Sequence, residues 1–358
     1  MEKVLDSEKI ISFFESFIRD SSLGIRTKKD GKRIRHSTVD NYRYAFNHLH
    51  DYVQSDRLEW KIYYYNRLNQ REREQAKRYN KRFYQSLTQF LYEKNLFDNY
   101  VGMVIKCLKA FYNYLEIDRN IIVGPYHKTF VVPVEEVQII ALTPKQFSYV
   151  MHNEQFNEKV VERNLEKIRD VFVFGCTVAL RFSDLMDLDK RNITKMGNST
   201  YLQVKSQKSN TYTSIKLPQY AIDIIEKYVE EKKLLPTFSK WWFNKELKRM
   251  GELLPENMEV VKTRERNGKQ VVIYKDEATK ENYSIADLLS SHVMRRTAIT
   301  TMLSLGMPEH LVRKISGHAP NSKSFFRYVQ YTQHLLDAAT DDIFDQLTGE
   351  KKRQKRYA

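Results

Sequence analysis

The chain has 358 residues, of which 41% are hydrophobic and 13% aromatic. It therefore carries too much apolar surface to remain disordered, and it is long enough to bury two separate cores. Lysine and arginine outnumber aspartate and glutamate by 60 to 45, which gives a net charge of +15 and favours a polyanionic partner such as nucleic acid over charge that serves solubility alone.

Cysteine content and hydropathy exclude several further classes of protein. Cys107 and Cys176 are the two cysteines and lie in apolar stretches, so they cannot build a disulfide framework or a cysteine-based zinc site. The N-terminal residues lack a charged start followed by an apolar run, and no apolar stretch approaches the length that spans a membrane. We expect a soluble, cytoplasmic protein without membrane contact.

The first third of the chain predicts a small bundle of helices. Apolar residues recur at three- and four-residue intervals around residues 11–17, 42–52, 79–92 and 101–115. Ser37, which follows a basic segment, is the expected N-cap of the second helix. This pattern predicts an all-helical domain over residues 1–122.

Residues 123–141 contain two prolines and no helical period, which predicts an extended connector. Thr143 and Pro144 then provide a capping residue and a first-turn proline for a new helix. The second domain is therefore expected over residues 142–358.

The second domain is expected to combine helices with two small antiparallel hairpins. Helices are predicted around residues 158–175 and 181–188. One hairpin pairs residues 201–204 with 213–217, and the other is closed by Asn267-Gly268, a strong signal for a tight turn. The predicted fold class is mainly α, with an α+β second domain.

Candidate functional residues lie in four short segments of this domain. A phosphodiester gains negative charge on its nonbridging oxygens when it is attacked, so a catalyst without metal must surround it with fixed cations and donors. Each residue alone has an ordinary explanation, such as a surface ion pair, a turn lysine or a helix-stop glycine. Their order along the chain indicates a common site: Arg181 in Ala-Leu-Arg-Phe-Ser-Asp-Leu, Lys208 in Ser-Gln-Lys-Ser, His292 and Arg295 in His-Val-Met-Arg-Arg, His318 after Gly317, and Tyr328 in Phe-Arg-Tyr.

Helical spacing supports the arrangement of two of these segments, the one at Arg181 and the one at His292. Asp184 follows Arg181 by three residues, so it can orient the guanidinium on one helical face. His292 and Arg295 have the same spacing and are expected on one side of a helix that Ser291 caps.

These segments resemble the tyrosine recombinase, or phage integrase, family, and the resemblance spans both predicted domains. The segment at Arg181 looks like the family's first-arginine box, and the segment at Lys208 like its hairpin lysine. Ser-Ser-His292-Val-Met-Arg295 is similar to the box that carries the second arginine, and Ile-Ser-Gly-His318 to the element before the nucleophile. Residues 240–249 and the Asn-Gly hairpin look most like integrases of mobile elements from Bacteroides-type bacteria.

The resemblance implies a role for each residue. Tyr328 would attack the scissile phosphate and join the 3′ end of the cut strand, while Arg181, Arg295 and His318 would hold the phosphoryl oxygens. Lys208 would protonate the departing 5′ oxygen, and His292 would assist proton transfer. Because the phosphotyrosyl bond conserves the energy of the phosphodiester, no cofactor is required.

Alternatives remain for the nucleophile and for the class of reaction. The interval from His318 to Tyr328 is one residue longer than the family's commonest spacing, and Tyr331 is a second phenol nearby. A type IB topoisomerase would use nearly the same residues, and a DNA-binding regulator without catalytic activity is the non-enzyme alternative.

The resemblance also implies the partners. The N-terminal bundle is similar to a core-binding (SAM-like) domain that grips double-stranded DNA, and residues 332–347 carry an apolar stripe that would either pack on its own core or dock on a neighbouring subunit of a homotetramer. DNA-bending accessory proteins and a place at the bacterial nucleoid follow from the same comparison. The candidate phosphate contacts are Lys28, Lys29, Lys32, Arg33, Arg35, Arg71, Arg73, Lys77, Arg78, Lys81 and Arg82.

Overall fold

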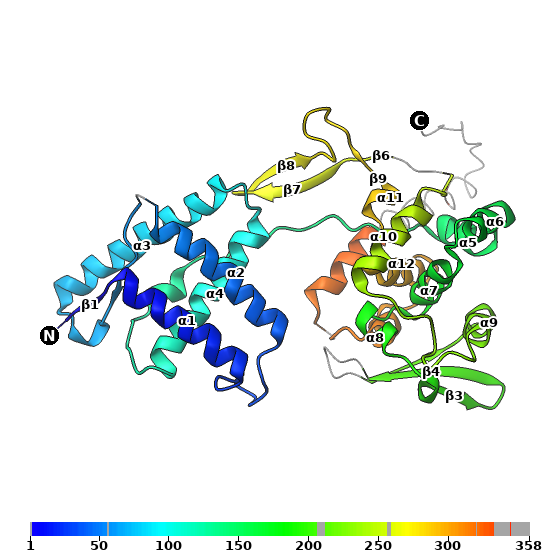
Figure 1. Ribbon diagram of the computed structural model, residues 1–358, viewed down its shortest axis with the longest axis horizontal. Coiled ribbons are helices and arrows are strands. Elements are labelled where there is room, and N and C mark those ends of the chain that lie inside the picture. The colour runs from blue at the N-terminus through cyan, green and yellow to red at the C-terminus, as the bar shows by residue number, and fades with distance from the viewer. Residues whose placement is uncertain are drawn as a thin grey trace. The chain divides into compact units, whose positions relative to one another are not determined.

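The structure is a computed structural model that describes residues 2–55, 57–205, 212–255, 259–319, 321–332 and 344. The chain folds into two compact units (Figure 1). The first consists of Met1–Val137 and Thr263–Ile273, and the second of Gln138–Lys262 and Tyr274–Ala358. Both are mainly helical with small antiparallel sheets, which confirms the predicted fold class. Within the described residues, no helix combines the length and hydropathy needed to cross a bilayer.

The first unit is a helical bundle, as the periodicity predicted. Aromatic side chains fill its core, with Phe14, Trp60 and Phe111 fully buried in mutual ring contact. The elements are β1 (Val4–Leu5), α1 (Ser7–Leu23), α2 (His36–Val53), β2 (Ile62–Tyr63), η1 (Tyr65–Arg67), α3 (Gln70–Glu93), α4 (Asp98–Ile117) and η2 (Tyr126–Thr129), with β1 and β2 paired antiparallel.

The predicted N-cap of α2 is wrong. Arg35 is the N-cap, in an extended conformation and without a capping side-chain bond. Its carbonyl already accepts from the N–H groups of Thr38 and Val39, so Ser37 lies inside the first turn.

A hairpin from late in the sequence belongs to the first unit. Strands β7 (Lys262–Arg266) and β8 (Lys269–Ile273) are joined by Asn267 and Gly268, whose φ values of 52° and 69° confirm the predicted tight turn. The N–H groups of these two turn residues donate to the two carboxylate oxygens of Asp98, at 2.7 and 3.0 Å. The sequence pattern predicted the pairing but not the surface on which the hairpin packs.

An ion pair fixes the same hairpin from its other side. The Arg264 guanidinium donates to both carboxylate oxygens of Glu135, whose side chain is fully buried. The Glu265 N–H donates to the same carboxylate at 2.8 Å. These charge-assisted bonds offset the cost of burying the carboxylate, and Arg264 keeps the pKa of Glu135 below its usual value although burial opposes this.

The second unit is built around helix α7 (Glu166–Val178), which packs against α12 (Ser291–Ser304). Its other helices are α5 (Pro144–His152), α6 (Glu154–Glu162), α8 (Phe182–Met186), α9 (Gln219–Lys227), α10 (Lys240–Gly251), α11 (Ile285–Leu288), α13 (Glu309–Ser316) and the short η3 (Lys190–Asn192). Residues 323–332 are also helical. The strands are β3 (Ile193–Met196), β4 (Ser199–Lys205), β5 (Tyr212–Lys216), β6 (Glu259–Val260) and β9 (Tyr283–Ser284), in the antiparallel pairings β3-β4-β5 and β6-β9.

Several predicted boundaries in this unit are confirmed. Thr143 caps α5 and forms a reciprocal capping box with Gln146, and Pro144 occupies the first turn. Strands β4 and β5 form the first predicted hairpin, and Gly317 ends α13 with φ 62°.

Other predictions in this unit are wrong. The helix expected over residues 158–175 is divided into α6 and α7, because Asn164 takes a left-handed conformation with φ 57°. Ser291 is not the cap of α12: Ser290 precedes the helix, and the Ser291 N–H donates instead to the Asn244 side chain at 2.7 Å. Strand β3 was missed because it lies at the sheet edge without a buried face.

Candidate active site

A polar cavity of about 340 Å³ in the second unit gathers most of the predicted catalytic residues. Five of the six line it: Arg181, His292, Arg295, His318 and Tyr328. The sixth, Lys208, lies outside the described residues. The cavity is also lined by Ile139, Arg296, Gly317, Ala319, Ser322, Ser324 and Arg327.

Arg181 is placed by the end of the central helix. It follows the buried stretch 171–180 and forms the N-cap of α8. Asp184, with a side chain only 2% exposed, lies 3.9 Å from the Arg181 guanidinium. The predicted pairing at three-residue spacing is confirmed, and its buried carboxylate limits where the guanidinium can point.

Arg295 is held by the C-terminal end of α7. Its Nη1 donates to the Ala179 carbonyl at 2.9 Å, and Ala179 ends α7 in a left-handed conformation with φ 55°. Burial and the neighbouring Arg181 charge lower the pKa of Arg295 to about 10, so the Arg295 guanidinium is still charged at neutral pH. Two cations beside one cavity repel each other, and a bound anion would relieve that repulsion.

His318 is oriented by a serine at the end of the preceding helix. The Ser316 hydroxyl donates to the Val312 carbonyl at 2.6 Å and lies 2.8 Å from His318 Nδ1. Since the hydroxyl proton is already used, we assign the proton of the neutral imidazole to Nδ1, which donates to Ser316. Arg295 Nη2 lies 3.3 Å from both Nδ1 and Nε2 of His318. Burial and the charges of Arg295, Arg181 and Arg313 lower the pKa of His318 to about 3.

His292 lies in the first turn of α12 and lines the cavity. Burial and the positive charges of Arg296, Arg295, Lys240 and Arg181 lower its pKa to about 4. The imidazole is therefore neutral at pH 7 and can accept a proton.

Arg296 is a cavity residue that the sequence analysis missed. It is half-buried, and its pKa is lowered by burial and raised by the nearby Tyr328 phenol. Arg296 follows His292 by four residues, and Arg295 follows it by three. Both spacings place the arginine on the same helical face as His292. The four-residue spacing from His292 was the signal in the sequence that could have identified Arg296 as a site residue.

The two candidate nucleophiles differ in their surroundings. Tyr328 is 8% exposed, lines the cavity and has its ring centroid 6.0 Å from that of His318. Tyr331 is not a lining residue, and burial raises the pKa of its phenol. The Thr332 hydroxyl donates to the Tyr328 carbonyl at 3.0 Å and fixes the helical turn that carries Tyr328.

The candidate phosphate contacts of the first unit are all exposed to solvent. They fall into two groups: Lys28, Lys29, Lys32, Arg33 and Arg35 lie on the segment between α1 and α2, and Arg71, Arg73, Lys77, Arg78, Lys81 and Arg82 lie on the solvent face of α3. The opposite face of α3 carries buried Tyr79, Phe83 and Leu87. The structure therefore leaves both groups accessible to a polyanion.

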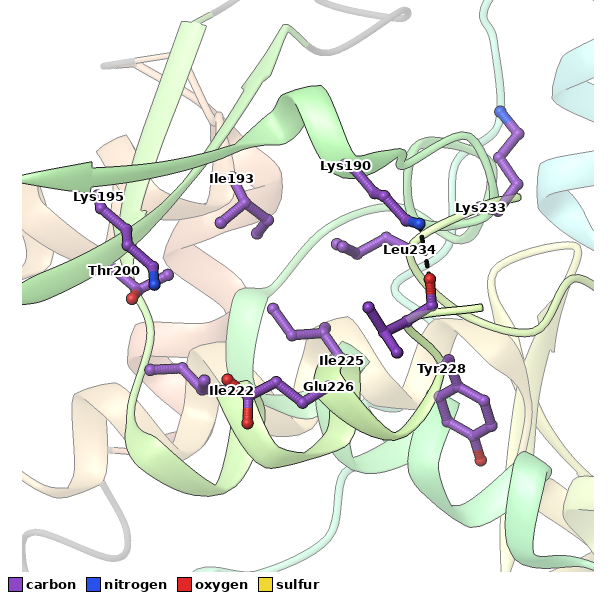
Figure 2. A pocket seen from close by; sticks show the side chains of 11 residues that line it. Lys190, Ile193, Lys195, Thr200, Ile222, Ile225, Glu226, Tyr228, Lys233 and Leu234 are labelled. Atoms are coloured by element: carbon purple, nitrogen blue, oxygen red, sulfur yellow. Dashed lines mark hydrogen bonds between the residues drawn. The ribbon is translucent and has the colours of Figure 1, made fainter. Parts of the chain in front are cut away.

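A second cavity, of about 330 Å³, lies elsewhere in the same unit (Figure 2). Its lining is aliphatic, with Ile193, Ile222 and Leu234 beside Lys190, and the Lys190 ammonium donates to the Val229 carbonyl at 2.6 Å. None of the five predicted catalytic residues that the structure describes borders this cavity, so the polar cavity is the candidate active site.

The mainly helical architecture is the fold of the tyrosine recombinases. Solved structures with this fold include a lambda integrase dimer bound to a COC′ core site, with a TM-score of 0.58 and 10% identity over 91% of this chain and 77% of that chain. A lambda integrase tetramer bound to a Holliday junction has a TM-score of 0.57 and 11% identity over the same shares of the two chains. XerH site-specific recombinase bound to difH substrate, in a pre-cleavage complex, has a TM-score of 0.51 and 13% identity over 95% and 90%.

The family is shown by a direct match in sequence. The model of the phage integrase family matches residues 142–334, more than half of the chain, and the chain belongs to this family. It is a tyrosine site-specific recombinase. No curated protein matches the chain.

Proposed function

We propose that the protein cleaves and rejoins double-stranded DNA through a 3′-phosphotyrosyl bond on Tyr328. The observation that carries this assignment is the single cavity in which Arg181, Arg295, two neutral imidazoles and a phenol meet. A cavity with this surplus of fixed donors suits an anionic phosphodiester better than a neutral substrate.

The cations would bind the scissile phosphate before chemistry begins. Arg181 and Arg295 would donate to its nonbridging oxygens, where charge grows as the fifth bond to phosphorus forms. His318 would join them as an Nε2–H donor, which requires the imidazole to take up a proton, and the negative charge of the bound phosphate favours the protonated form. The buried Asp184 and the Ala179 carbonyl keep both guanidinium groups aligned.

In the chemical step the Tyr328 oxygen forms a bond to phosphorus, and the bond from phosphorus to the 5′ oxygen breaks. The phenol proton would pass toward neutral His292, and Lys208 would donate a proton to the departing 5′ oxygen. Rejoining is the reverse reaction, with a 5′ hydroxyl as the attacking group. Arg296, whose pKa the nearby Tyr328 phenol raises, would donate a hydrogen bond to the developing phenolate.

Residues 1–122, which make up most of the first unit, would hold the DNA as a core-binding domain, with a connector at 123–141. Its exposed lysines and arginines between α1 and α2 and along α3 would contact phosphates. Residues 142–358 would form the catalytic domain.

The assembly would be a homotetramer on two paired DNA sites. The lambda integrase structures are described as a dimer and a tetramer on DNA, which supports an oligomer here. The apolar stripe over residues 332–347, most of which lies outside the described residues, would dock on a neighbouring subunit. The protein would integrate or excise a mobile element of the Bacteroides type. It would act at the bacterial nucleoid, together with accessory proteins that bend the DNA.

A nicked suicide substrate tests the nucleophile. We expect the wild-type protein to form a covalent adduct that denaturing electrophoresis detects, and Tyr328→Phe to form none because it lacks the attacking oxygen. Tyr331→Phe is the matched control, since it removes a phenol three residues away, and it should retain adducts.

Two results would contradict the proposal. Adducts that persist in Tyr328→Phe and disappear in Tyr331→Phe would move the nucleophile to Tyr331. Adducts on DNA of any sequence, without strand exchange, would indicate a topoisomerase instead.

A further inference from the structure

Helix α10 exposes two adjacent tryptophans near its N-terminus. Trp241 is 71% exposed and Trp242 44%, and their ring centroids are 6.4 Å apart. The Lys245 ammonium lies 5.6 and 5.5 Å from the two ring centroids. Two large neighbouring aromatic surfaces in water are unfavourable for a free protein, which points to a ligand for them.

The helix itself is firmly anchored. Phe243 and Leu247 on its opposite face are fully buried, and the Ser239 hydroxyl caps the helix by accepting from the Trp242 N–H at 3.2 Å. The exposure of the tryptophans is therefore a property of a fixed helix face, and the two rings form a preorganised surface.

Interactions on two sides place the start of α10 beside the active-site cavity. The Asn244 side chain accepts from the Ser291 N–H at 2.7 Å, at the residue before His292. The Phe243 ring lies 5.0 Å from that of Phe182, which follows Arg181. The helix thus touches both of the elements that bring Arg181 and His292 to the cavity.

The charges on this helix favour an anionic ligand. Lys240, Lys245 and Lys248 are exposed, whereas the carboxylate of Glu246 is buried and paired with Arg249. Aromatic faces interleaved with exposed cations are the combination that binds single-stranded nucleic acid, because bases stack on the rings while the cations contact phosphates.

We propose that Trp241 and Trp242 form a stacking surface for DNA bases that become unpaired beside the scissile phosphate during strand exchange. Lys240 and Lys245 contact the flanking phosphates. In a paired duplex the faces of the bases are covered by their neighbours, and only opening of base pairs frees them to stack on the protein. This inference rests on the proposed function, which places the cleaved phosphate in the adjacent cavity.

Tryptophan fluorescence tests the proposal in the full chain. The third tryptophan, Trp60, is fully buried in the first unit and serves as an internal reference. In a Tyr328→Phe background, which leaves DNA uncut, we expect a short duplex with a run of mismatched bases to quench the fluorescence more than the same duplex fully paired. Trp241→Leu/Trp242→Leu should lose this quenching, and its preference for mismatched DNA should fall roughly tenfold, as expected for loss of base stacking.

The matched control is Tyr100→Leu, which removes a 47% exposed aromatic ring from α4 in the other unit and should keep the full preference. Equal quenching by mismatched and paired DNA, or no quenching by either, would overturn the stacking surface. Adduct formation by the otherwise wild-type Trp241→Leu/Trp242→Leu protein separates the two proposals. If this variant forms adducts at Tyr328 while the protein that keeps both tryptophans shows no preference for mismatched DNA in the quenching assay, the recombinase mechanism stands and the stacking surface fails.

Discussion

Arg295 and Arg296 are neighbours in sequence but serve different parts of the cavity. Arg295 is buried, bonded to the Ala179 carbonyl and adjacent to His318, so it faces the place where phosphate oxygens would lie. Arg296 is half-buried, which lowers its pKa, and the nearby Tyr328 phenol raises it. The first would stabilise charge on the phosphate and the second charge on the nucleophile.

We predict that Arg296→Gln slows adduct formation roughly tenfold or more at neutral pH, because a hydrogen bond to a charged group is worth about 1.5–3 kcal/mol. The loss should shrink as the pH rises, since bulk base then removes the phenol proton without help. A pH profile of the single-turnover cleavage rate measures this effect, and Arg296→Lys should recover part of the rate.

Lys314→Gln, an exposed position on α13, removes the same charge and serves as the control. It should leave the profile unchanged. An equal loss for Arg296→Gln at every pH would assign Arg296 a purely structural role.

At the scale of elements, the cavity depends on close packing between α7 and α12. Gly175 lies in α7, and a Cβ added there would meet Met294 Sδ at 2.5 Å, Met294 Cβ at 3.2 Å and Leu185 Cδ2 at 3.3 Å. Met294 immediately precedes Arg295, so any separation of the two helices moves the guanidinium. The missing side chain at residue 175 is therefore a requirement for the site as well as for the core.

We predict that Gly175→Ala destabilises the protein by about 1–3 kcal/mol through overpacking and reduces adduct formation. Met294→Ala removes the Sδ atom, which is the nearest of these three atoms, so the double variant should lose less stability than the sum of the two single variants. Urea unfolding of the four proteins measures the coupling. Strict additivity would show that the two side chains do not compete for the same space.

The elements that the sequence predicted correctly are those with local causes. Thr143 with Pro144, Asn267 with Gly268, and Gly317 each act through the backbone conformation of their own turn. Apolar periodicity was equally sufficient for the four helices of the first unit, because it indicates which helix face is buried.

What the sequence could not predict depends on packing between distant segments. The Ser291 N–H is satisfied by Asn244, 47 residues away, so no local pattern could show that Ser291 is not the cap. The hairpin of β7 and β8 docks on Asp98 and Glu135, more than a hundred residues earlier. In the same way, Arg296 is a site residue only because the segment carrying Tyr328 folds back against α12.

At the scale of the whole molecule, the chain passes between its two units at three places, at residues 137/138, 262/263 and 273/274. Both units carry exposed cations, and the net charge is +15. Because the units are parts of one connected chain, phosphates bound by either unit contribute to the same binding equilibrium. Each neutralised phosphate releases counterions from the DNA, and the affinity should fall steeply with salt.

We predict that the triple variant Lys77→Gln/Arg78→Gln/Lys81→Gln weakens DNA binding and makes the slope of log K against log salt less steep by about 0.9 for each phosphate that the protein no longer neutralises. Fluorescence anisotropy of labelled duplex DNA across a salt series measures the slope. The control Lys145→Gln/Lys159→Gln/Lys167→Gln makes the same change in net charge at exposed positions of α5, α6 and α7. Long-range attraction alone would change both slopes equally, whereas direct binding of phosphates by α3 requires a change in the first variant only. An unchanged slope in the first variant would remove α3 from the DNA interface and leave the segment between α1 and α2 as the remaining candidate of the first unit.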